Sequence, residues 1–67
     1  MTVARVTEIS STSTESFEDA VRQGIRRASA TLRNISGAWV QEQKAVVENG
    51  EVTAFQVNMK VTFILDD

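Results

Sequence analysis

Apolar side chains occupy every second position near the end of this chain. They are Phe55, Val57, Met59, Val61, Phe63 and Leu65. Between them stand mostly polar residues: Gln56, Asn58, Lys60 and Thr62. A period of two places the two sets on opposite faces of a β-strand. We therefore predict a strand whose apolar face packs in a core and whose polar face does not. No other feature limits the possible folds of the chain as strongly.

A second strand-like run precedes this one, and Asn49-Gly50 joins the two. Asn-Gly suits the type I′ turn of a two-residue hairpin, because both central residues take positive φ. The register set by such a turn gives four facing pairs: Glu48 with Glu51, Gln43 with Gln56, Gln41 with Asn58, and Trp39 with Lys60. Because directly opposed residues share a face, Trp39 is expected on the polar face, outside the core.

A helix of roughly 20 residues is expected before the hairpin, because apolar residues there recur in steps of three and four. They are Phe17, Ala20, Val21, Gly24, Ile25, Ala28, Leu32 and Ile35. The helix is expected to begin at Thr12, which has capping-box spacing to Glu15, or at Ser13 as an equally good N-cap. Residues 4–9 (ARVTEI) alternate loosely and predict a first strand.

The predicted fold is α+β with the order β-α-β-β, in a single domain over residues 1–67. A three-stranded antiparallel sheet folds around one helix, and a right-handed crossover places the last strand between the other two. The helix can cover only one side of the sheet. The other side is expected to carry Gly37, Trp39, Gln41, Gln43, Gln56, Asn58 and Lys60. An exposed indole on such a face is typical of an interface or of a site for a planar ligand.

The composition favours self-association as the source of additional stability. A chain of 67 residues has a small core, and with no Cys and no His it has neither disulfides nor the usual zinc ligands. Its net charge of -2 gives no long-range attraction to nucleic acid or to anionic lipid. The helix arginines lie near Glu18 and Asp19, which favours an ion-paired helix face. We expect a cytoplasmic protein with no membrane partner.

The sequence resembles the dodecins, small flavin-binding proteins of β-α-β-β fold. The likeness is carried by RVTEISSTSTESFEDAV, RRASATLRNI and FQVNMKVTFIL, and most specifically by Gln56 in its aromatic-Gln-Val context. The resemblance implies a hollow homododecamer with paired flavins stacked near its two-fold axes. It also implies storage or sequestration of riboflavin or FMN rather than catalysis, and the Ser and Thr residues of 10–16 have no His or Cys beside them to form a nucleophile pair.

The sequence also departs from the family pattern. The stacking Trp of flavin-binding dodecins aligns with Gly37, whereas the indole of this chain stands two residues later. Of two positions where several bacterial members have basic residues, Lys44 keeps the charge and Ile64 does not. Glycine at the tryptophan position is similar to a second branch of dodecin-like proteins, for which calcium has been proposed as ligand.

Two hypotheses follow. In the first, the chain is a non-catalytic flavin-binding protein whose predicted site residues are Gln56, Trp39, Gly37, Gln43 and Lys44. Trp39 would stack on the ring, and the amide of Gln56 would read its pyrimidine edge. In the alternative, the same homododecameric shell binds no flavin, and subunit packing or a cation such as calcium fills this face. A calcium site would need carboxylates from several subunits, because the chain has no D-x-D-x-D-G loop spacing.

Overall fold

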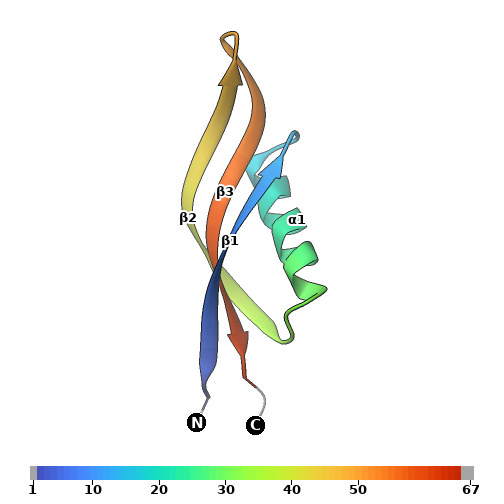
Figure 1. Ribbon diagram of the computed structural model, residues 1–67, viewed down its shortest axis with the longest axis vertical. Helices are drawn as coiled ribbons and strands as arrows, with labels where there is room; N and C mark the ends of the chain where they lie inside the picture. Colours follow the sequence, from blue (N-terminus) through green and yellow to red (C-terminus); the bar gives the residue numbers. More distant parts are fainter. Residues whose placement is uncertain (1, 66–67) are drawn as a thin grey trace.

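The computed structural model describes residues 2–65 and contains three strands and one helix. In chain order these are β1 (Ala4–Ser13), α1 (Phe17–Ser29), β2 (Ile35–Glu48) and β3 (Glu51–Ile64). Both strand pairs are antiparallel, and the sheet order is β1-β3-β2 (Figure 1). The predicted β-α-β-β order and the central position of the last strand are confirmed.

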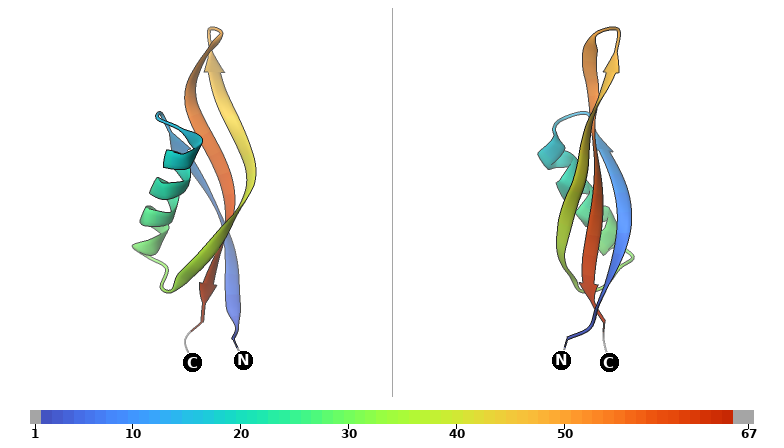
Figure 2. Two further views of the ribbon diagram at one scale, coloured as in Figure 1. Left: turned by 180° about the vertical axis from the view of Figure 1, so that it is seen from behind. Right: turned by 90° about the vertical axis from the view of Figure 1, so that its left-hand side faces the viewer.

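The core lies between α1 and one face of β3. Val57, Met59 and Val61 have no exposed surface, and they face the small buried residues Ala20, Gly24 and Ala28 of the helix. A Cβ on Gly24 would stand 2.8 Å from Met59 Cε and 2.9 Å from Ser11 Cβ, so a glycine is needed for this close approach. The helix lies on one side of the sheet only, and the other side is left open (Figure 2).

The helix begins later than predicted, because the polar cluster before it belongs to β1. Ser10 to Ser13 pair with β3, and this ladder satisfies their backbone groups. The N-cap is therefore Ser16 rather than Thr12 or Ser13, and its hydroxyl accepts a hydrogen bond of 2.9 Å from the Asp19 N–H. The buried Ser13 hydroxyl instead donates to Asp19 Oδ2 at 2.6 Å, which ties the end of β1 to the first helical turn.

The helix also ends earlier than the apolar pattern predicts. It has 13 residues and stops at Ser29. The N–H groups of Thr31 and Leu32 still donate to the Ala28 carbonyl, and Asn34 then takes a left-handed conformation with φ of 62°. Ile35 is already part of β2. Leu32 and Ile35 thus keep the helical spacing in the sequence but lie beyond the end of the helix, where the chain turns back along the sheet.

The β2–β3 hairpin has the predicted turn, with φ of 52° at Asn49 and 77° at Gly50. Two of the four predicted pairs are confirmed and two are wrong. Glu48 faces Glu51 and Trp39 faces Lys60, as expected. Gln56, however, faces Lys44 instead of Gln43, and Asn58 faces Glu42 instead of Gln41.

Two β-bulges explain this result. The register shifts between Val46 and Val47, where Thr53 of β3 has no partner, and shifts back between Val40 and Glu42, where Gln41 of β2 has none. Each bulge adds one residue to one strand, so the two shifts cancel from Val40 to Gly37, before a third shift between Gly37 and Ile35. Between them every β2 side chain lies on the face opposite to the predicted one.

Candidate ligand-binding face of the sheet

The side of the sheet that faces away from α1 gathers polar side chains from all three strands. We call it the uncovered face, and its members follow from the strand pairing. They are Glu8, Ser10 and Thr12 of β1, Gln56, Asn58, Lys60 and Thr62 of β3, and Gly37, Trp39, Glu42 and Lys44 of β2. Gln56 and Asn58 on the central strand are half-buried. They are the most enclosed amides on this face.

These two carboxamides are held by neighbours on opposite sides. Gln56 Nε2 donates to the Ser10 hydroxyl of β1 at 2.9 Å, whereas Asn58 Nδ2 donates to Glu42 Oε1 of β2 at 3.0 Å. Each amide therefore uses one N–H within the sheet. Its other N–H and its oxygen lone pairs remain as hydrogen-bonding capacity.

Trp39 lies at the β2 side of the same face, opposite Lys60. Its side chain is 61% exposed, so the indole is available as a flat apolar surface. Gly37 lies opposite Thr62, and a Cβ placed on it would meet no atom within 4 Å. The glycine thus leaves open space beside the indole.

Four of the five predicted site residues share the uncovered face, and one does not. Lys44 lies directly opposite Gln56, so the two residues are cross-strand neighbours on this face. Gln43 lies opposite Val57, on the side of the sheet that the helix occupies, because the bulge at Gln41 changes its face. The same bulge brings Glu42 to the uncovered face, where sequence reasoning had not placed it. Ser10 was also missed, since its strand was predicted to end at Ile9.

Comparison with known proteins identifies the family. A sequence profile described as "Dodecin" matches residues 3–66. The chain belongs to the dodecin family. The dodecin from Streptomyces davaonensis is 42% identical, with a TM-score of 0.93 over 98% of this chain and 97% of that one. The dodecin from Streptomyces coelicolor is 36% identical, with a TM-score of 0.92 over 98% and 94% of the two chains. A mutant of the dodecin from T. thermophilus is 30% identical, with a TM-score of 0.93 over the whole of both chains. No curated protein matches the sequence.

Membership fixes the broad class of activity. Dodecins are small non-catalytic binding proteins, the family binds flavins and forms homododecamers, and the dodecin fold implies such an assembly. Within residues 2–65, no three His, Cys, Asp or Glu side chains are grouped so that they could hold a metal ion. No helix in this part of the chain is long and apolar enough to cross a membrane.

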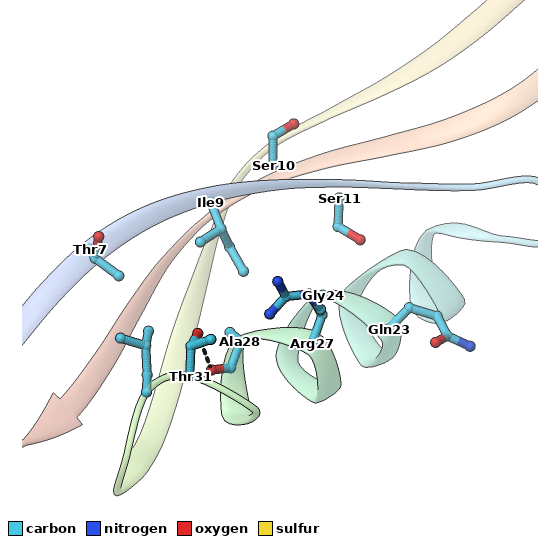
Figure 3. Close-up of a pocket in the computed structure, with 10 residues that line it drawn as sticks. Thr7, Ile9, Ser10, Ser11, Gln23, Gly24, Arg27, Ala28 and Thr31 are labelled. Atoms are coloured by element: carbon cyan, nitrogen blue, oxygen red, sulfur yellow. Dashed lines mark hydrogen bonds between the residues drawn. The ribbon is translucent and has the colours of Figure 1, made fainter.

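A separate groove of about 640 Å³ lies between α1 and β1. It is lined by Ile9, Gly24, Ala28 and Leu32 and by polar side chains that include Arg27. In Figure 3, Ile9 and Ser11 point toward the helix, whereas Ser10 points to the opposite side of the sheet. None of the five predicted site residues lines this groove, although Ser10 of β1 borders both the groove and the uncovered face.

Proposed function

We propose that this member of the dodecin family binds riboflavin or FMN without catalysis and stores or sequesters it. The observation that carries the proposal is the grouping of Trp39, Gln56 and Lys44 on the uncovered face. A flat isoalloxazine ring favours offset stacking on an indole, worth about 0.5–1.5 kcal/mol beyond the buried area. One carboxamide has both a donor and an acceptor, which suits the alternating pyrimidine edge of the ring.

Distance within one chain favours a site shared between copies. Trp39 lies opposite Lys60, four residues from Gln56 along β3. At the usual rise per residue this separation is about 13 Å. A two-fold axis would repeat both residues and could place the indole of one copy near the Gln56 amide of another. We therefore place the flavin site between subunits of a homododecamer.

The exposure of β2 supports this assembly. Trp39 on one face of this edge strand is 61% exposed, and Val40 on the other is 43% exposed. At the tip of the β2–β3 hairpin, Val47 and Val52 are 59% and 52% exposed. Exposed apolar side chains along an unpaired strand edge are a liability unless another chain covers them. A cytoplasmic location stays a prediction.

The test is a titration of riboflavin and FMN into ligand-free protein, followed by flavin fluorescence. We expect strong quenching at micromolar protein, because stacking on an indole quenches the ring. Trp39→Ala should abolish the quenching. Val3→Ala is the control, since it truncates an exposed apolar side chain before β1, away from β2, and should leave the quenching intact. Light scattering on each sample gives the mass of the assembly.

A second candidate function is a dodecin shell without flavin. Gly37, with open space around its Cα, favours this alternative, because the position holds no ring to stack on a flavin. Neighbouring subunits would then cover Trp39, and any calcium site would combine carboxylates from several chains. Unchanged flavin fluorescence in a protein of twelvefold mass would support the shell. Heat released when calcium is titrated into that protein would identify calcium as the bound cation. A stable monomer would overturn both candidates.

A further inference from the structure

We propose that Asn58 is a second amide that reads the ligand edge, and that Ser10 and Glu42 are positioning residues that orient the two amides. This inference rests on the proposed flavin site and extends it to three residues that are not among the five predicted site residues. Gln56 and Asn58 are two residues apart on β3, so their side chains stand on the same face. Both are half-buried, whereas Lys60, the next residue on that face, is exposed.

The strand pairing makes Asn58 the next side chain after Gln56 on the uncovered face. Asn58 and Glu42 form the row between the Gln56–Lys44 pair and the Lys60–Trp39 pair. Along β3 the two amides are about 7 Å apart, because their positions differ by two residues. A ring that stacks on the indole of another copy and turns its edge toward Gln56 therefore meets Asn58 with the same edge.

The hydrogen bonds to neighbouring strands determine which donors and acceptors each amide has left for a ligand. Ser10 accepts one N–H of Gln56 from the β1 side, and Glu42 accepts one N–H of Asn58 from the β2 side. A carboxylate can only accept, so Glu42 fixes which end of the Asn58 amide turns toward it. The Ser10 hydroxyl can donate as well as accept, and in the structure it accepts from Gln56, which leaves the Gln56 oxygen available. Two oriented amides then present a second N–H each, with their oxygens as acceptors.

This set matches an imide edge, in which an N–H stands between two carbonyls. One amide can pair with only two neighbouring atoms of that edge, whereas two amides can supply the donor, acceptor and donor that it requires. The site should therefore discriminate against a flavin whose imide nitrogen carries a methyl group. Methylation removes one hydrogen bond, which contributes about a factor of 2 to 10 in affinity, so riboflavin should bind about two- to tenfold more tightly than N3-methylriboflavin.

The experiment measures dissociation constants of riboflavin and N3-methylriboflavin by calorimetry for the assembled protein and its variants. Asn58→Ala should weaken riboflavin binding by about three- to tenfold and reduce the preference over the methylated flavin. Ser10→Ala and Glu42→Ala should lower the same preference, whereas Ser10→Thr and Glu42→Gln, which keep an acceptor oxygen, should restore it. Gln23→Ala and Ser29→Ala on the helix are the matched controls for loss of an amide and of a hydroxyl.

Each outcome decides between the two proposals. If the unmodified protein binds neither flavin, the proposed function and this inference both fail. Binding of both flavins with equal affinity overturns the inference and leaves flavin binding standing. The same holds if the preference persists in Asn58→Ala. A lost preference in Ser10→Ala that Ser10→Thr does not restore overturns the positioning role.

Discussion

The two faces of β3 are made by alternate residues of one strand, yet different interactions fix their side chains. On the covered face, Val57, Met59 and Val61 are fully buried and pack against small helix residues. On the uncovered face, Gln56 and Asn58 are half-buried and make hydrogen bonds to side chains of β1 and β2. Nondirectional apolar contact stabilises the first face, whereas directional bonds organise the second.

This difference separates stability from binding within one strand. Truncating a covered side chain leaves a cavity that the surroundings fill only in part. Truncating an uncovered side chain leaves groups that water can still reach, so folding is affected much less. Variants of the covered face should therefore change the free energy of unfolding, and variants of the uncovered face should change mainly the ligand affinity.

The largest effect is expected for Met59→Ala, because Met59 is fully buried. The loss in unfolding free energy should be about 2–5 kcal/mol. Lys60→Ala, the adjacent residue on the exposed side, is the matched control and should stay within about 0.5 kcal/mol. Urea denaturation at a fixed subunit concentration measures both, since the stability of an oligomer depends on concentration. Equal losses in the two variants would contradict the proposed division between the faces.

Gly24→Ala tests how tightly the covered face is packed. The new Cβ would stand 2.9 Å from Ser11 Cβ, which has no flexible end to move away. We expect a net loss of about 1–3 kcal/mol from overpacking, although alanine favours the helix by roughly 1 kcal/mol. Ser29→Ala on the exposed side of the helix should instead be neutral or slightly stabilising. A more stable Gly24→Ala protein would show that the helix can move away from the sheet at little cost.

Ser16→Ala tests whether the covered face depends on the start of the helix. Loss of the bond from the Asp19 N–H to the Ser16 hydroxyl should cost about 1 kcal/mol. Ser16→Asp keeps an acceptor and should recover most of this loss, whereas Thr14→Ala, at an exposed position before the cap, should change little. Thermal unfolding by circular dichroism gives the comparison. An unaffected Ser16→Ala protein would mean that the Ser13–Asp19 contact fixes the helix start without the cap.

The smallest effect is expected on a third surface, the far side of α1, where Arg22 and Glu18 form an exposed ion pair with an N–O distance of 2.7 Å. Removing it by Arg22→Ala should cost about 0.3–0.5 kcal/mol, and high salt should reduce the difference. A double-mutant cycle with Glu18→Ala isolates the pair. A coupling well above this value would show that the pair is enclosed in the assembly.

The site was predictable in part. The Asn-Gly turn and the alternation of β3 placed Trp39, Gly37 and Gln56 on one face, and this placement holds because two unpredicted register shifts cancel. The register in the middle of the hairpin was not predictable, because register is strongly specified only where one face is buried. All residues of β2 except Ile35 and Val46 are exposed, so its sequence gives no burial signal that would reveal the bulge at Gln41.

The sequence alone determined the elements of this protein. The period of β3, the small-residue stripe of α1 and the positive-φ turn at Asn49 and Gly50 are local properties, and local sterics and side-chain burial suffice to specify them. Only the tertiary structure decided where the helix begins, because pairing with β3 draws Ser10 to Ser13 into β1. It also decided that Glu42 and Lys44, rather than Gln41 and Gln43, stand beside the two amides. The two cancelling bulges set that choice, since they depend on how the strands twist against each other, which no single strand encodes.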